Sequence, residues 1–113
     1  MPITIQREST EYVFLGLTGD VPATGVEMAF LAAGVRPTGG DWETAILIDT
    51  DVHALWPEAL ASGVTGDYYA ARLIGSFGGN TVTLTAGDYQ VWVRVTDTTE
   101  QPVKLAPVVL TVA

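Results

Sequence analysis

A histidine and two aspartates at alternate positions form a grouping with the spacing of a metal site. On an extended strand, Asp49, Asp51 and His53 would share a face, where carboxylate oxygens and an imidazole nitrogen could hold a metal ion. The chain has a single histidine and no cysteine, so few further ligands exist. The alternative is a solvated acidic loop with one histidine, which we favour because spacing alone is a weak signal. We therefore expect no bound metal.

A serine hydrolase would need His53 as general base, and the candidate nucleophiles are Ser9, Ser62 and Ser76. None of these serines lies in a nucleophile elbow, the sharp turn that exposes the catalytic serine of many hydrolases. No Gly-rich loop opens a helix after a strand, so the pattern of a phosphate cradle is missing as well. We expect that the protein is not an enzyme and binds no cofactor.

The balance of charges argues against nucleic-acid binding. Thirteen acidic residues against five basic ones give a formal net charge of -8. Binding to a phosphate backbone relies instead on lysine and arginine. The five bases are scattered along the chain, at Arg7, Arg36, Arg72, Arg94 and Lys104. The acidic residues indicate a solvated surface.

Trp92 and Arg94 are the residues best suited to binding another molecule, because these two types dominate interface energetics. They alternate with three valines, so they stand on the outer face of their sheet if the valines line a core. Apolar residues of other strands would lie near Trp92 if those strands are its neighbours, namely Ala45, Leu47 and Val109. The candidate protein interface comprises Trp92, Arg94, Leu47 and Val109.

Two other interpretations of Trp92 remain open. The long connection over residues 50–67 could fold over the ring and cover it. Alternatively, Trp92 could join Trp56 and Tyr68 in presenting aromatic rings to a sugar.

The strand that positions Trp92 is the clearest element of the sequence. Residues 89–97 alternate with a period of two, which indicates a strand with one buried face. Gly87-Asp88 makes a turn before it, and Leu84 closes the preceding strand. This order is typical of the tyrosine corner of Greek-key sandwiches, in which the tyrosine hydroxyl, here that of Tyr89, bonds to the backbone upstream. An ordinary hairpin that contains a tyrosine is the alternative.

Seven further segments have the length and pattern of strands. They are bounded by turn residues and cover 3–6, 12–17, 26–32, 42–49, 68–74, 81–85 and 103–112. No run of helices could cover a parallel sheet. The predicted fold is an all-β, antiparallel Ig-like Greek-key β-sandwich of about seven or eight strands. Its one core is predicted to contain Met28, Phe30, Ile46, Ile48, Leu73, Val82, Leu84, Val91, Val93 and Val95.

Three details of this fold are also predicted. The connection over residues 50–67 should carry one or two helical turns, because Pro57 suits a helix start and Gly63 a helix end. A connection this long is often functional, but we favour a crossover between the two sheets. Trp42 is either a core residue or a shield for a sheet edge. Pro107 cannot donate to a ladder, so the last strand is an edge strand or contains a bulge.

The chain has the size of one domain. Its 113 residues suffice for a sandwich over residues 11–113, preceded by an N-terminal strand or arm over residues 1–10 that could add to a neighbour's sheet. We expect no signal peptide, and no apolar run reaches the roughly 20 residues of a membrane helix. Hydrophobic residues make up 48% and charged residues 16%, which is apolar for a free monomer and indicates an assembled protein.

Several runs give the sequence a resemblance to a known family. They are Val26 to Phe30, Asp41 to Ala45, Tyr69 to Arg72, Gly87 to Asp97 and Glu100-x-Pro102-Val103. Over residues 10–113 the chain resembles the small β-sandwich domain of actinobacteriophage virion proteins, including long-tail-fibre proteins of corynebacteriophages. The resemblance implies a structural role in a virion. It specifies neither the part of the particle nor any functional residue.

We expect a bacteriophage structural protein, specifically a capsid decoration or accessory (minor head) protein that acts through protein–protein contacts. Its partners would be the major capsid protein or other virion proteins, in an oligomer or symmetric array. It would be made in the host cytoplasm and located in the virion. A tail or head–tail connector subunit is one alternative. A carbohydrate-binding or adhesin module is another, since sandwiches host all of these functions.

Overall fold

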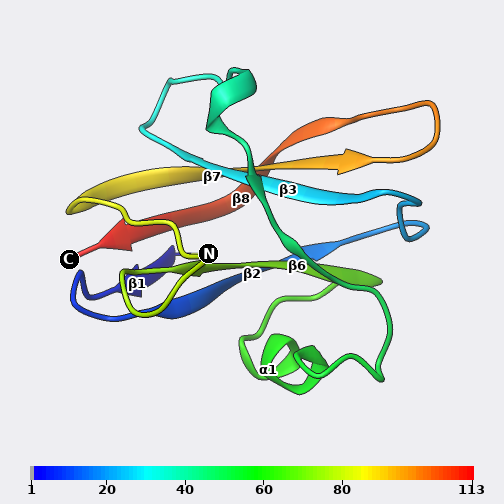
Figure 1. Cartoon of the computed structure of the whole chain (residues 1–113), viewed down its shortest axis with the longest axis horizontal. Helices are drawn as coiled ribbons and strands as arrows, with labels where there is room; N and C mark the ends of the chain where they lie inside the picture. Colours follow the sequence, from blue (N-terminus) through cyan, green and yellow to red (C-terminus); the bar gives the residue numbers. More distant parts are fainter. Residues whose placement is uncertain (1) are drawn as a thin grey trace.

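Two β-sheets lie face to face in the computed structural model, which describes residues 2–113. The five-stranded sheet has the order β1 (Pro2–Ile5), β8 (Val103–Val112), β7 (Gly87–Thr96), β3 (Gly25–Leu31) and β4 (Glu43–Thr44). The three-stranded sheet has the order β2 (Glu11–Leu17), β6 (Tyr68–Ile74) and β5 (Ile46–Ile48). The predicted all-β class is confirmed, and Figure 1 shows the two layers.

One pair of strands departs from the predicted antiparallel arrangement. β1 runs parallel to β8, from Pro2 opposite Val109 to Ile5 opposite Val112. All other strand pairs are antiparallel. β1 and β8 are the two ends of the chain and share no hairpin, so nothing forces them to run in opposite directions. The segment predicted as a strand or arm therefore pairs within its own chain, although residue 1 lies outside the described residues.

The main core lies between the sheets and contains the inward-facing side chains of both. Met28, Val91 and Leu110 are fully buried there, and Val93 and Phe30 are nearly so. Val82, Leu84 and Val95 are partly buried against this cluster. These positions confirm the larger part of the predicted core.

Three of the predicted core residues lie elsewhere. Ile46 and Ile48 belong to a second cluster on the outer face of the three-stranded sheet. Leu73 alternates with Ile74, which faces the main core, so Leu73 also points outward. The prediction of one core was wrong because β5 and β6 are apolar on both faces, and alternation does not reveal which face meets the other sheet.

The second cluster exists because the connection between β5 and β6 folds back over the sheet. Its helix α1 (Trp56–Ala61) packs against Phe14, Tyr69 and Ala71 and lies below the sheet in Figure 1. The predicted helical turns are confirmed. The crossover interpretation is wrong, since β5 and β6 are neighbours in one sheet. None of residues 2–113 forms a helix long and apolar enough to cross a membrane.

The crossover between the sheets occurs where a single strand over residues 42–49 was predicted. β4 pairs with β3 in the five-stranded sheet, whereas β5 pairs with β6 in the other. Ala45 lies between them, and its backbone N–H donates to the carbonyl of Val26 at 3.0 Å. The strand is therefore divided between the two sheets.

Residues 81–85 form no strand, contrary to the alternation of their sequence. They make one isolated parallel bridge, between Val82 and Ile74. The chain passes here from β6 in one sheet to β7 in the other. A segment that crosses between sheets cannot pair along its whole length with either.

Tyr89 makes the hydrogen bond predicted for a tyrosine corner. Its hydroxyl donates to the carbonyl oxygen of Thr85, four residues upstream, at 2.7 Å. The hydroxyl of Thr85 lies 3.1 Å from the same oxygen of Tyr89. The bond holds the chain where it enters β7. The predicted turn at Gly87-Asp88 is wrong, because both residues pair with β8 as the first two residues of β7.

Pro107 lies in an irregular stretch of β8. The register shifts between Gln90, which faces Val109, and Trp92, which faces Leu105. Since β8 lies between β1 and β7, it is not an edge strand. Of the two predicted alternatives, the bulge is the one observed.

Val93→Ala should reduce the free energy of unfolding by about 1–3 kcal/mol, because Val93 is 2% exposed and the change removes burial and leaves a cavity. Chemical denaturation measures this. Val52→Ala is the matched control, since Val52 is 88% exposed. Equal effects of the two changes would contradict the assignment of Val93 to the core.

Tyr89→Phe should reduce the free energy of unfolding by about 1 kcal/mol through loss of the bond to Thr85. Tyr12→Phe removes a hydroxyl that makes no such backbone bond among the described residues, and serves as control. An unchanged denaturation midpoint for Tyr89→Phe would show that its hydroxyl is equally well satisfied by water.

Candidate interaction surface on the five-stranded sheet

The outer face of the five-stranded sheet is formed by alternate residues of three neighbouring strands. Trp92 of β7 lies between Ala29 of β3 and Leu105 of β8. Arg94 lies in the same way between Glu27 and Val103. The valines between them face the main core, so the predicted outward direction of Trp92 and Arg94 is what the structure shows.

Trp92 is nevertheless buried, with 7% of its surface exposed. The guanidinium of Arg36 lies over the indole ring at 5.3 Å from its centre, a cation–π arrangement. The ring is therefore covered by its own sheet and by Arg36. The connection over residues 50–67 cannot cover it, because that connection lies on the three-stranded sheet.

The indole N–H of Trp92 has no hydrogen-bond acceptor among the described residues. An unsatisfied buried donor costs about 1–3 kcal/mol. The position of this ring is thus held by apolar contact and by Arg36 rather than by a hydrogen bond.

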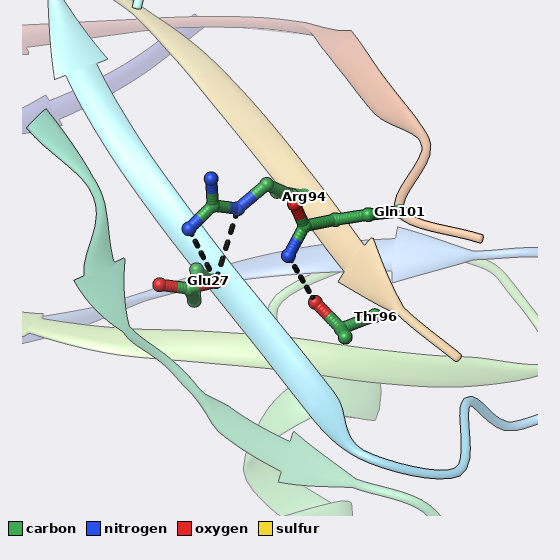
Figure 2. Close-up of polar contacts among 4 residues, drawn as sticks. All are labelled: Glu27, Arg94, Thr96 and Gln101. Atoms are coloured by element: carbon green, nitrogen blue, oxygen red, sulfur yellow. Dashed lines mark hydrogen bonds and ion pairs between the residues drawn. The ribbon is translucent and has the colours of Figure 1, made fainter. Parts of the chain in front are cut away.

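Arg94 is engaged within the chain. Its Nε and Nη2 both donate to one oxygen of Glu27, at 3.0 and 2.7 Å, as Figure 2 shows. Its guanidinium also lies 4.7 Å from the centre of the Trp42 ring. Nearby, the side-chain amide of Gln101 donates to the hydroxyl of Thr96 at 2.9 Å. Arg94 therefore orders this end of the face, and Trp42 shields the sheet rather than filling the core.

Four apolar side chains on this face or in the loop that carries Arg36 remain close to half exposed, and we call them the apolar rim. They come from β8 and from the loop that carries Arg36, with exposures of 45–48%: Val35, Val103, Leu105 and Val109. Arg36 itself is exposed and makes no ion pair within residues 2–113. A face that combines apolar side chains with a stacked Trp–Arg pair has the composition of a protein interface.

Leu47 does not belong to this face. It lies in β5 and packs against the main core between the sheets. Ala45 is buried there as well. The sequence analysis placed both residues near Trp92 only if their strands were neighbours of its strand. They are not, because this segment is divided between the two sheets.

The three aromatic residues considered for sugar binding lie in three different places. Tyr68 is buried in the main core, and burial raises the pKa of its hydroxyl, with a smaller contribution from the Asp97 carboxylate. Trp56, the first residue of α1, packs edge-on against Tyr69 at 4.8 Å between the ring centres. Together with Trp92 they present no common platform.

His53 has a local structural contact. Its Nδ1 accepts a hydrogen bond from the backbone N–H of Leu55 at 3.1 Å, just before α1. Within the described part of the chain, no three His, Asp or Glu side chains lie close enough together to hold a metal ion. Ser62, one of the candidate nucleophiles, donates its hydroxyl to the carbonyl of Ala59 at the end of the helix.

Sequence reasoning missed Arg36 and Val35. Both lie in the loop after β3, and no periodic pattern in that loop indicates which face it returns to. The one signal that could have indicated them is a base directly after an apolar residue in a loop.

Comparison with known proteins gives no assignment. No protein-family model matches the chain, and the searches of curated proteins and of solved structures found no match.

The Glu27–Arg94 pair should contribute modestly to stability, because both side chains are about a quarter exposed, at 27% and 21%. A double-mutant cycle with Glu27→Gln and Arg94→Gln should give a coupling free energy of about 0.5–1 kcal/mol that declines with added salt. Denaturation of the four proteins at two salt concentrations measures it. A coupling of zero would mean that only the stacking on Trp42 holds Arg94.

Proposed function

We propose that this protein is a structural subunit of a bacteriophage particle, which binds a virion protein through the outer face of its five-stranded sheet. The observation that carries the proposal is the apolar rim around the Arg36–Trp92 stack. Scattered exposed apolar residues are ordinary on protein surfaces, but several on one face favour a docking site.

We further propose that the sandwich has the Ig-like Greek-key arrangement. Ig domains place strands B, E and D in one sheet and C, F and G in the other. With β2, β6 and β5 in the first set and β3, β7 and β8 in the second, the strand orders correspond. Tyr89, at the start of β7, then lies at the F-strand position of the tyrosine corner. Such a module is suited to presenting a face to a partner.

The likeness of the sequence to actinobacteriophage virion domains supports the choice of particle. The net charge of -8 suits the outside of a capsid better than the side that faces the genome. Among virion roles we propose decoration of the capsid, with the major capsid protein as partner. A tail or connector subunit would use the same face at another place on the particle.

The test is to mix the protein with expanded phage shells that lack it, and to image the particles. Symmetric density at fixed capsid positions is the expected result. Density confined to the portal vertex or tail would move the proposal to a connector subunit. Absence of binding to any particle, with retention on a glycan array, would overturn it in favour of a sugar-binding module.

Leu105→Glu should abolish binding to the particles, because it places a charge in the apolar rim without touching the core. Leu60→Glu is the matched control, since Leu60 is similarly exposed but lies on α1 at the other sheet. Cosedimentation with shells compares the two variants. Equal loss, or loss only with Leu60→Glu, would contradict the use of the five-stranded face.

A further inference from the structure

The edge strands of the two sheets differ in their protection against pairing with another strand. β4 has two residues, β5 has three, and β1 has four beginning with Pro2. Short strands and prolines are the usual means of blunting a sheet edge. β2 has seven residues, and its sequence contains no lysine and no proline.

β2 also keeps an unbroken register with β6 along its whole length, from Glu11 opposite Ile74 to Leu17 opposite Tyr68. Val13 and Leu15 are buried in the main core, and Phe14 is buried under α1. The side chains of β2 are thus packed on both faces of the sheet. At its free edge, β2 presents backbone N–H and C=O groups.

A groove opens beside the end of this edge. It has a volume of about 320 Å³ and lies between residues 104–108 of β8 and the end of β2, with residues 63–65 as its third wall. β1 pairs with β8 further along, from Val109 to Val112. Among residues 2–113, Lys104 is the one charged residue that lines the groove.

We propose that β2 pairs antiparallel with β2 of a second copy, about a twofold axis at Phe14. The two three-stranded sheets then become one continuous sheet, and the interface is the same patch on both copies. In this register Glu11 of the second copy lies opposite Leu17, and Val13 of the second copy lies opposite Leu15.

Charge complementarity favours this occupant over an unrelated strand. Glu11 alternates with Val13 and Leu15, so it faces the side of the sheet on which the groove opens. Opposite Leu17 it reaches the mouth of the groove, which Leu17 and Lys104 line together. The twofold axis forms this carboxylate–ammonium pair twice. The two Glu11 side chains stay about 20 Å apart, at opposite ends of the strand pair.

The experiment is sedimentation velocity of the full chain from micromolar to millimolar concentration. Glu11→Lys and Lys104→Glu should each weaken the dimer at least about tenfold, and the double variant should recover it. Both residues are exposed, so the monomer fold is kept, which the melting temperature checks. Glu100→Lys makes the same charge change outside the interface and should leave the dimer unchanged.

The direction of the effect is diagnostic. Glu11→Lys changes the net charge from -8 to -6, which by itself reduces repulsion between copies. Weakening against that trend, with recovery in the double variant, supports the β2 pairing. A protein that is monomeric at every concentration overturns it, as does a dimer that both reversals leave unchanged. The measurement contains no phage particles, so its outcome is independent of particle binding through the outer face of the five-stranded sheet.

Discussion

Burial of the three-stranded sheet on both faces is the constraint on which the rest of the structure depends. β2 and β6 carry apolar side chains on both sides, so one face needs the five-stranded sheet and the other needs a further layer. The long connection supplies that layer with α1. Its approach is close, because a Cβ at Gly16 would lie 1.9 Å from the carbonyl oxygen of Thr65. Only glycine allows the backbone of this connection to lie directly on β2.

Because the long connection covers the three-stranded sheet, the outer face of the five-stranded sheet is less covered. With the longest connection placed on the three-stranded sheet, only the loop after β3 remains to shield the outer face of the five-stranded sheet. From that loop, Arg36 stacks on Trp92 and Trp42 stacks on Arg94, both of which lie in β7. The residues of β8 in the apolar rim, Val103, Leu105 and Val109, therefore remain close to half exposed. The two faces of the molecule thus differ because the chain has one long connection and two sheets.

The sequence predicted local elements well and their pairing less well. β7, α1 and the Tyr89 bond follow from neighbouring residues, so alternation and Pro57 were sufficient to locate them, although Gly87 and Asp88, predicted as a turn, begin β7. Leu73 and Ile48 were assigned to the wrong face, because a strand apolar on both sides has no periodic signal for its orientation. The division of residues 42–49 between two sheets depends on distant partners, and so does the cover over Trp92. Leu47 was therefore placed on a surface that its strand never reaches.

The parallel pairing of β1 with β8 gives the two ends of the chain a mechanical relationship. β1 begins beside Val109, β8 ends beside Ile5, and the two strands run the same way. A pull that separates the ends acts along both strands in opposite directions. It loads the hydrogen bonds of this ladder in shear, all together, instead of opening them one after another as a zipper opens. Two neighbours that held the molecule by its ends would therefore meet resistance first at these four residue pairs, before either sheet lost its core.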